Sequence, residues 1–563
     1  MRSLSLLVAF ASVPWAYAQH VTGIKAGVNQ QTGERPARLN IDDLQARGGP
    51  AWDLFIQALA AIEEAPESDL LSWFQIAGIH GLPFRGYNGV ENVEGGLTAA
   101  GFCPHGSINF GTWHRPYVAL LEQTVQSQAE QIAAKYSGAS AAEYQAAART
   151  LRFPYWDWAV SSQLPAAVME QTVKINAPNG AVKLRNPLYS YQFQTFPFSD
   201  PDFQGQEISQ FNETKRCTDA AEDSDGVDHP EIINSFLGDH AKRLKDYVYA
   251  VFTQSPNFVD MASTYAKGPS FENPHNIVHQ DIGGGPLWTK TGHMKPVAWS
   301  AFDPIFWLHH TNLDRQFAMW QAIYYQNPML NTTVPGLATF GQAAGPVTAD
   351  SPLKPFTDET GAFWTNKRIT STRAFGYTYE GIEDWTLAAP ELAKKVTAQV
   401  NKLYGPPAPS AVAKKVWNKS QAAAAFSAAA ANQEKDYSVE IQVNRVDLPL
   451  PCSIQILVGE ENKEAGQFAL LAMPEVGQGF ASIPLRRTLE EAGVSLESPA
   501  SEVVAVLKKS LRVVDGTTVP PESVQSLVVE IQDRDYTPRQ SDSEFPRYGI
   551  PTSWPVDVKD TSG

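Results

Sequence analysis

Two groups of three histidines constrain the fold of this chain more than any other feature of its sequence. The first group contains His80, His105 and His114, and the second contains His275, His279 and one of the adjacent pair His309 and His310. His275 and His279 are four residues apart, so on a helix both lie on one face and can bind one metal ion. Helical bundles build dinuclear metal sites from residues on facing helices. The sequence therefore predicts that two distant segments meet around a pair of metal ions.

The stretch FDPIFWLHHTNLDR, residues 302–315, indicates which of the adjacent histidines binds metal. If this stretch is helical, Phe306, His310 and Asp314 form one stripe. His309 lies on the neighbouring stripe, which is apolar. A metal-binding histidine usually has a carboxylate or carbonyl partner that fixes its ring. We therefore predict His310 as the ligand, Asp314 as its partner, and His309 as a hydrogen-bonded core residue.

The composition of the two groups limits the metal that they can bind. All-imidazole triads without carboxylates suit copper or zinc better than magnesium or calcium. A zinc protease would carry a glutamate directly after the first histidine of an H-E-x-x-H motif, but Asn276 stands at that position. A single histidine is more often structural than a ligand, so the prediction depends on the two triads occurring together.

The rest of the sequence predicts a helical part followed by a smaller β part. Apolar residues recur at spacings of three and four over much of residues 40–340, between connectors rich in glycine and proline. From Asp436 onward, the segments SVEIQVNR, SIQILVGE and SLVVEIQ alternate like strands. We expect a mainly α fold, in which an antiparallel four-helix bundle with long loops carries the dinuclear site, and a C-terminal β-sandwich.

These patterns divide the chain into four parts. Residues 1–18 read as a signal peptide, because a basic residue precedes a short apolar run and Ala16-Tyr17-Ala18 fits a cleavage site. An N-terminal anchor is the alternative, although the apolar run is too short to span a bilayer. Residues 19–385 are the expected metal-binding domain. Residues 386–435, with two Lys-Lys pairs and an alanine-rich stretch, are expected to form a linker with some helix and a processing site. Residues 436–563 are the expected sandwich.

Charge and cysteine content restrict the partners and the compartment. The formal net charge of −16, from 44 basic and 60 acidic side chains, argues against nucleic acid and anionic membranes as partners. The three cysteines, Cys103, Cys217 and Cys452, can form at most one disulfide, which excludes a disulfide framework. Sequons at Asn212, Asn331 and Asn418 are typical of an exported chain. We therefore expect a secreted protein without a membrane segment.

The motifs around the histidines resemble those of the type-3 copper proteins, in particular the fungal tyrosinases and related polyphenol oxidases. AGIHGLPF surrounds His80, NFGTWHRPY surrounds His114, and FPYWDW, HNIVH and FDPIFWLHHTNLDR follow in the order of that family. The resemblance implies an oxidoreductase with two copper ions that acts on small phenols with O2. It assigns the first copper to His80, His105 and His114 and the second to His275, His279 and His310.

The resemblance also implies roles for residues around the copper ions. Cys103-Pro104-His105 matches the C-x-H arrangement that forms a thioether between the sulfur and an imidazole carbon in this family. Glu272 and Asn276 stand at positions that can hold a water acting as base toward the phenol. Val297 stands where catechol oxidases of plants and oxygen carriers place a bulky residue, so access is expected to be open. Phe306 is expected to lie beneath the site.

Further motifs imply a latent enzyme. Tyr377-Thr378-Tyr379 resembles the Y-x-Y motif that ends the catalytic domain of the family, and Arg38 matches the arginine that docks near it. Fungal members often carry a C-terminal domain that plugs the site until proteolysis, so an activating protease is an expected partner. Phe468 and Phe480 are the candidate plugs. The C-x-x-C motif for copper delivery, which some C-terminal domains of the family carry, is replaced here by Cys452-Ser-Ile-Gln.

Several functions are compatible with these patterns. The leading hypothesis is a secreted tyrosinase, which o-hydroxylates monophenols and oxidises o-diphenols to o-quinones. A catechol oxidase, which lacks the first step, is the alternative enzyme. An oxygen carrier with the same copper site, or a zinc-loaded or metal-free binding module, is the alternative outside catalysis. The signal peptide, the small residue Val297 and the cleavable tail favour an enzyme.

Overall fold

A computed structural model describes residues 19–221, 224–285, 289–327, 329–406, 434–459, 463–507, 511–514 and 518–556. The predicted signal peptide, residues 1–18, lies outside the described residues. Residues 407–433 of the predicted linker, with Lys414, Lys415 and Asn418, also lie outside them.

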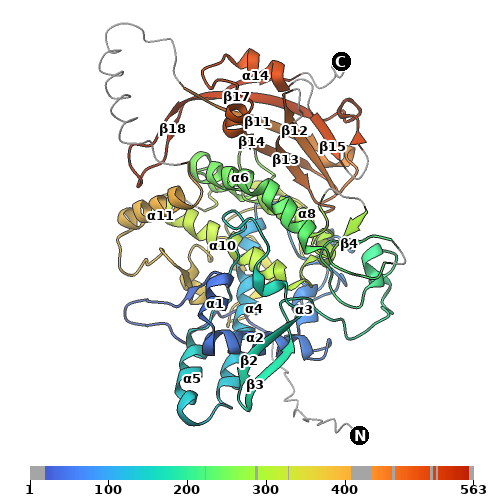
Figure 1. Ribbon diagram of the computed structural model, residues 1–563, viewed down its shortest axis with the longest axis vertical. Helices are drawn as coiled ribbons and strands as arrows, with labels where there is room; N and C mark the ends of the chain where they lie inside the picture. Colours follow the sequence, from blue (N-terminus) through green and yellow to red (C-terminus); the bar gives the residue numbers. More distant parts are fainter. Residues whose placement is uncertain are drawn as a thin grey trace.

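The first four hundred residues or so are mainly helical, and the chain ends in a β region, which confirms the predicted order (Figure 1). No helix among the described residues is long and apolar enough to cross a membrane. The helices of the first part are α1 (Ile41–Arg47), α2 (Gly49–Glu64), α3 (Trp73–Gly78), α4 (Phe110–Ala133), α5 (Ala141–Thr150), α6 (Pro230–Gln254), α7 (Phe258–Ala262), α8 (Glu272–Ile282), α9 (Val297–Ser300), α10 (Pro304–Ile323) and α11 (Ala389–Leu403).

Short strand pairs brace the long loops between these helices. The pair β1–β10 is parallel and the other four pairs are antiparallel. The pairs are β1 (Ala37–Arg38) with β10 (Thr378–Tyr379), β2 (Thr172–Ala177) with β3 (Gly180–Arg185), β4 (Thr218–Asp219) with β5 (Lys290–Thr291), β6 (Val334–Gly336) with β7 (Gly345–Val347), and β8 (Pro352–Thr357) with β9 (Phe363–Thr365).

Helices α8 and α10 lie in the interior. All eleven residues of α8 are buried, and α10 is buried along nearly its whole length. Apolar residues on every side of α10 explain why it is enclosed rather than lying at a surface. Its start is fixed by Asp303, whose side chain accepts a hydrogen bond from the Ile305 N–H (3.1 Å), and by Pro304 at the first helical position. The histidines of FDPIFWLHHTNLDR are therefore held on a rigid element in the core.

The C-terminal region consists of two mainly antiparallel sheets. One sheet has the order β14-β11-β17-β18, with β19 also paired to β17, and the other has the order β13-β12-β15-β16. The sheets touch where Phe468 of β13 meets Gly479 of β14, since a Cβ added to that glycine would lie 3.0 Å from the ring. The elements are β11 (Lys435–Asn444), β12 (Cys452–Val458), β13 (Lys463–Leu470), β14 (Gln478–Pro484), α13 (Arg486–Glu491), α14 (Ala500–Leu507), β15 (Leu511–Val514), β16 (Thr518–Val519), β17 (Val528–Thr537), β18 (Arg547–Tyr548) and β19 (Thr552–Pro555).

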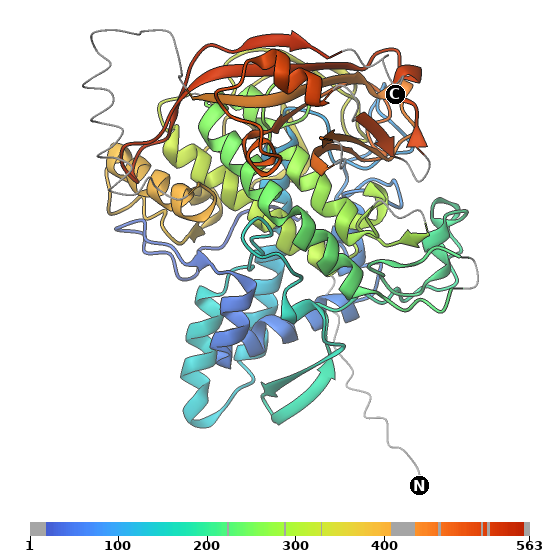
Figure 2. The same cartoon turned by 45° about the horizontal axis from the view of Figure 1, so that its top comes forward.

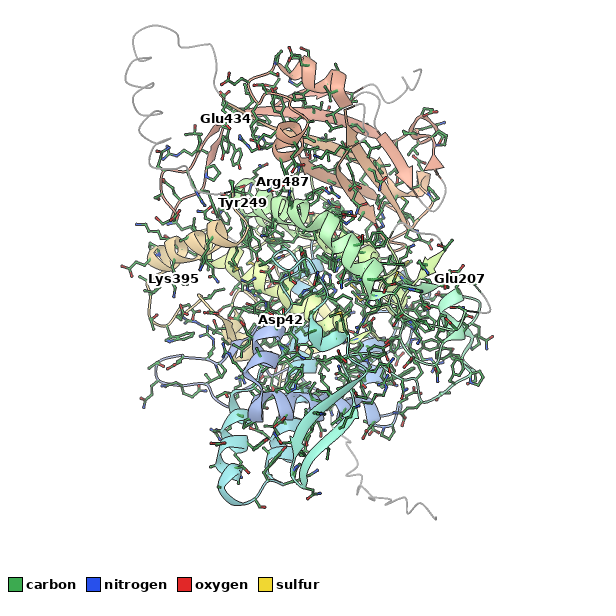
Figure 3. The ribbon with its side chains drawn as sticks, viewed as in Figure 1. Asp42, Glu207, Tyr249, Lys395, Glu434 and Arg487 are labelled. Carbon is green, nitrogen blue, oxygen red and sulfur yellow. The ribbon has the colours of Figure 1, made fainter. Side chains whose placement is uncertain are left out.

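The C-terminal sheets cover α6 and α8, as both ribbon views show (Figure 1, Figure 2). Strand β13 contacts α8, and β14 contacts α6. Arg487 of α13 forms a bidentate ion pair with Asp246 of α6, with N–O distances of 2.6 and 2.7 Å (Figure 3). The C-terminal region is thus docked on the side of the helical part that carries α8.

Part of the predicted linker belongs to the helical core. Helix α11 lies within residues 386–435 and packs against α10 and α6, with Leu392, Val396 and Val400 buried. Just after α11, the Tyr404 hydroxyl donates to Asp157 Oδ2 (2.8 Å) and accepts from Arg315 Nη1 (3.0 Å). The spacing of four between the apolar residues of α11 is the pattern in the sequence that indicates a helix packed on one face.

We predict that Tyr404→Phe lowers the free energy of unfolding by about 1–3 kcal/mol, because it removes a buried hydrogen bond to a charged pair. Urea unfolding followed by tryptophan fluorescence measures the change. Tyr325→Phe is the control, since Tyr325 is 41% exposed and its loss should change stability by less than about 0.5 kcal/mol. Equal stabilities of Tyr404→Phe and the parent would show that α11 is not anchored in this way.

Candidate metal centre

Two clusters of potential ligand atoms lie next to each other in the core. One contains His80, Cys103, His105 and His114, and the other contains His275, His279, His309 and His310; within each cluster the ligand atoms lie within 4.8 Å of one another. His80 follows α3, His114 lies on α4, and the second cluster comes from α8 and α10. The rings of His114 and His310 are stacked with their centroids 4.1 Å apart, so the two clusters are in direct contact.

Backbone carbonyls fix three of the rings. His80 Nδ1 donates to the Val297 carbonyl (3.0 Å), His114 Nδ1 to the Phe110 carbonyl (2.7 Å), and His279 Nδ1 to the Met294 carbonyl (2.8 Å). Because a carbonyl can only accept, each of these rings carries its proton on Nδ1. The Nε2 lone pair of each is therefore left for a metal.

The second triad converges on one point. His310 Nε2 lies 3.2 Å from His275 Nε2 and 3.4 Å from His279 Nε2. His275 Nδ1 donates to Asn276 Oδ1 (2.9 Å), so its Nε2 is also unprotonated. The Nε2 lone pairs of His275 and His279 thus both face His310 Nε2, which can donate at most one proton, whereas a cation among the three nitrogens satisfies all of them. In the other triad, His80 Nε2 is buried without a hydrogen-bond partner among the described residues. The donor set therefore fits a pair of metal ions that prefer imidazole.

Burial keeps these imidazoles neutral. It lowers the pKa of His114 to about 3 and that of His279 to about 4. Burial, together with the neighbouring imidazoles, also lowers the pKa values of the other four: His80, His105, His275 and His310. Metal binding requires the neutral ring, so the site is in the ligating protonation state throughout the physiological pH range.

The surroundings of His309 and Asp314 differ from the prediction. Neither ring nitrogen of His309 has a hydrogen-bond partner among the described residues, and the ring instead stacks on His275 at 4.7 Å. Asp314 accepts hydrogen bonds from two arginines, Arg115 Nε at 2.6 Å and Arg38 Nη1 at 3.0 Å, and from two tyrosines, Tyr377 at 2.6 Å and Tyr379 at 2.7 Å. His310 Nδ1 has no partner within the described part of the chain.

The reason for the difference is electrostatic. Burial alone would raise the pKa of Asp314, but Arg115 and Arg38 hold it below its usual value. A buried carboxylate is stabilised more by two guanidinium groups than by a neutral imidazole. Asp314 therefore supports α10 rather than orienting His310.

Glu272 and Asn276 lie on α8 but do not contact each other through a hydrogen bond among the described residues. Glu272 Oε1 accepts from the Gly106 N–H (2.6 Å), next to His105, and Oε2 accepts from the Thr264 N–H (2.8 Å). Burial raises the pKa of Glu272, which these hydrogen bonds partly offset. Asn276 Nδ2 donates to the Ala469 carbonyl of β13 (3.0 Å). Both side chains are thus engaged in the intact chain.

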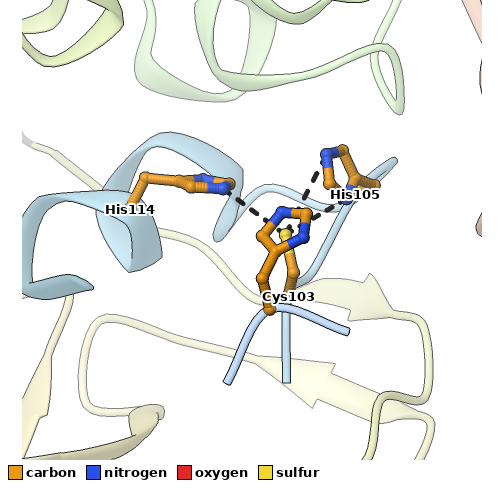
Figure 4. A group of neighbouring side chains, drawn as sticks. Cys103, His105 and His114 are labelled. Atoms are coloured by element: carbon orange, nitrogen blue, oxygen red, sulfur yellow. Dashed lines mark hydrogen bonds between the residues drawn. The ribbon is translucent and has the colours of Figure 1, made fainter. Parts of the chain in front are cut away.

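The other predicted residues also lie at the site. Cys103 Sγ is 3.1 Å from His105 Nδ1 and 3.4 Å from His114 Nε2 (Figure 4). Phe306 packs its ring 4.1 Å from His310 and 4.8 Å from His80, measured between centroids. Val297 is buried, and its carbonyl orients His80, a role that its side chain could not have revealed.

The contacts of the two predicted plugs lie within the C-terminal region and at a surface cavity. Phe468 packs against Gly479 inside the C-terminal region, and Phe480 lines a surface cavity with Lys267 and Pro269. The turn after β13 approaches the loop that carries His105, since a Cβ on Gly106 would be 3.1 Å from Pro474 Cγ. The guanidinium of Arg445 holds this turn by donating to the carbonyls of Pro474 (2.5 Å) and Leu471 (2.6 Å).

Comparison with known proteins identifies the family. The family model described as the common central domain of tyrosinase matches residues 70–323. A tyrosinase of Podospora anserina is 33% identical over 406 residues, which cover 68% of this chain and 69% of that protein. The chain belongs to the tyrosinase family. Polyphenol oxidase 4 of Agaricus bisporus is 31% identical over 389 residues, covering 66% of this chain and 61% of that protein.

The fold agrees with that assignment. A solved structure of latent and active mushroom tyrosinase superposes with a TM-score of 0.80 at 25% identity, covering 96% of this chain and 99% of that one. Members of the tyrosinase family are copper-dependent oxidoreductases that act on phenols through a type-3 copper pair. This chain is therefore a copper oxidoreductase, and its two histidine clusters are suited to two copper ions.

We predict that His310→Ala reduces the copper content from two ions to about one, because it removes a nitrogen on which His275 and His279 converge. His309→Ala should keep both ions and lower the free energy of unfolding by about 1–3 kcal/mol, since it removes a buried stacked ring. Metal analysis and urea unfolding of the two neighbouring variants provide the comparison. Loss of copper from His309→Ala alone would reverse the assignment.

Proposed function

We propose that this chain is a secreted, latent tyrosinase. It converts a monophenol and one O2 into an o-quinone and one water, and two o-diphenols and one O2 into two o-quinones and two waters. The observation that carries the proposal is the adjacency of two buried, neutral imidazole triads, linked by the stacked rings of His114 and His310. In this proposal the copper pair lies in an antiparallel four-helix bundle that includes α4, α8 and α10.

The protein residues have assigned roles in this proposal. His80, His105 and His114 hold one copper, and His275, His279 and His310 hold the other. The copper pair, when bound, supplies the two-electron chemistry with O2. The rings of Phe110 and Phe306, which lie 4.8 Å from His275 and 4.1 Å from His310, exclude water from the ligand rings. A thioether between Cys103 and His105 would further restrict the His105 imidazole.

Proton handling is assigned to Glu272 and Asn276. A monophenol, with a pKa near ~10, must lose its proton before hydroxylation. Burial raises the pKa of Glu272, which makes its carboxylate a better proton acceptor than an exposed one. Asn276 donates one amide N–H to the Ala469 carbonyl in the intact chain, and its second amide N–H is assigned to hold the water. Val297 leaves the approach to the ligand rings open.

Latency is attributed to the docked C-terminal region. The turn held by Arg445 lies against the His105 loop, and β13 lies along α8. We propose that a protease cuts within residues 407–433 and that α11 stays with the enzyme through its Tyr404 anchor. Two solved structures with a similar fold are described as latent mushroom tyrosinase and Aspergillus oryzae pro-tyrosinase, which supports the proposal of a latent form.

A catechol oxidase without monophenolase activity is the second candidate. The observation that favours it is the engagement of both Glu272 oxygens by the backbone of Gly106 and Thr264, which would keep the carboxylate from a water.

Oxygen uptake distinguishes the two candidates. The copper-loaded chain, activated by limited proteolysis, is given tyrosol with a trace of diphenol. We expect sustained uptake with quinone formation, and we expect Glu272→Gln to lower tyrosol turnover more than catechol turnover. Consumption of catechol but not tyrosol would identify a catechol oxidase, and an equal loss on both substrates in Glu272→Gln would remove its role in proton handling.

We predict that Arg487→Ala raises the activity of the uncut chain. The ion pair with Asp246 is partly exposed, so it stabilises docking by no more than about 1 kcal/mol, which corresponds to a roughly fivefold larger open population. Oxygen uptake by the uncut, copper-loaded variant measures this. Arg373→Ala is the matched control, because its ion pair with Asp384 (2.9 Å) lies within the helical part. Equal activation by both variants would show that the effect does not come from docking.

A further inference from the structure

Strand β13 is an edge strand whose outer side is bound by side chains instead of by another strand. Among the described strands it pairs with β12 on one side only. On the other side, the Gln467 N–H donates to the Tyr247 hydroxyl (2.9 Å), and the Gln467 carbonyl accepts from Tyr247 (3.1 Å) and from Asn273 Nδ2 (3.2 Å). The Ala469 N–H donates to Asn273 Oδ1 (3.1 Å), and its carbonyl accepts from Asn276. The N–H and carbonyl groups of Gln467 and Ala469, which all point outward from the sheet edge, are therefore all hydrogen-bonded.

These contacts form a recognition surface for an extended backbone. Tyr247 comes from α6, and Asn273 and Asn276 come from one face of α8, three residues apart. Every one of their bonds to residues 467 and 469 is to a backbone atom, so the contacts do not depend on the side chains of the bound strand. The position of Gly466 is restricted, because a Cβ there would lie 2.3 Å from the Tyr247 hydroxyl oxygen.

The surface leads toward the copper ligands. Asn276 donates a hydrogen bond to the Ala469 carbonyl and accepts one from His275 Nδ1. Farther along the chain, Pro474 lies against Gly106, next to His105. A chain seated like β13 therefore runs past the second triad and reaches the first within about five residues, and residues 471–473 span the interval between them.

We propose that the processed enzyme uses Tyr247, Asn273 and Asn276 to bind extended polypeptides and act on a tyrosine four to six residues after the position of Gln467. The substrate class is then tyrosyl side chains in extended segments of proteins, in addition to small phenols. In the latent chain, β13 occupies this surface. The inference rests on the proposed function, since the C-terminal region must leave before a substrate can bind.

The geometry predicts on which side of the tyrosine the recognised residues must lie. A tyrosine must have residues on its N-terminal side to gain the backbone bonds, and residues on its C-terminal side add nothing. The probe is the peptide acetyl-Gly-Gln-Thr-Ala-Thr-Ser-Tyr-amide, whose first residue takes the Gly466 position. The peptide of reversed order has the same composition and is its control. With two to four hydrogen bonds gained, we expect a KM on the order of tenfold lower for the forward peptide.

Backbone methylation separates this proposal from general affinity for peptides. Successive residues of an extended strand direct their N–H groups to opposite sides, so those of the glutamine and the alanine share one side. N-methylation at the glutamine or the alanine should therefore abolish the advantage of the forward peptide. N-methylation at the threonine between them should preserve it, because that N–H faces away from α8.

The measurement uses the copper-loaded chain after proteolytic activation, once residues 434–563 have separated. Oxygen uptake gives the KM values, and calorimetry with a phenylalanine in place of the tyrosine gives binding without turnover. Tyr247→Phe should remove the forward preference in both measurements and leave the KM for N-acetyltyrosine amide unchanged. Tyr249→Phe, on the same helix but bonded to Asn401 (2.7 Å), should retain the preference.

The two possible failures are distinct. Equal binding of forward, reversed and methylated peptides would overturn the inference, whatever the turnover. Absence of oxygen uptake with every monophenol, while calorimetry still shows the forward preference, would overturn the proposed monophenolase activity and leave the recognition surface supported.

Discussion

The buried carboxylate of Asp314 holds four segments together, and the geometry of the metal centre depends on it. It joins Arg38 of β1 and Arg115 of α4 to α10, and it accepts from the tyrosines on either side of Thr378 in β10. A carboxylate and two guanidinium groups in the core are stable only while they remain paired. Arg115 directly follows His114, and Asp314 lies one turn after His310. The same contacts therefore keep the two stacked imidazoles in register.

Around this ionic cluster, the site itself contains almost no charge. The ligand rings are neutral because burial lowers their pKa values, and backbone carbonyls accept hydrogen bonds from the Nδ1–H groups of His80, His114 and His279. A metal pair bound only by neutral imidazoles keeps its positive charge, since no carboxylate of the described residues belongs to either cluster. The fold thus separates two tasks: charged pairs fix the helices, and uncharged rings bind the metal.

Local patterns in the sequence were sufficient to predict the histidine clusters, the helix that begins at Pro304, and the strands β11, β12 and β17. The family resemblance also correctly placed Arg38 beside Tyr377 and Tyr379. Other roles that depend on distant residues were not predictable from local patterns. Asp314 shares a helical stripe with His310, but its partners Arg38 and Arg115 lie 276 and 199 positions away in the sequence. The carbonyls of Met294 and Val297 orient rings through backbone geometry, which leaves no mark on residue type. The turn at Pro474 could not be predicted by searching for a plug among aromatic residues.

In the proposed activation, the outer edge of β13 would determine the fate of the C-terminal region after cleavage. In the intact chain its backbone groups are satisfied by Tyr247, Asn273 and Asn276, and the Phe480 N–H at the edge of the second sheet donates to the Thr264 carbonyl (2.8 Å). Once the C-terminal region leaves, both sheets present open edges to solvent, which is the arrangement that favours strand pairing between molecules. Released C-terminal regions would then associate with one another instead of returning to the enzyme. Activation would proceed in one direction, with self-association of the inhibitor preventing its reversal.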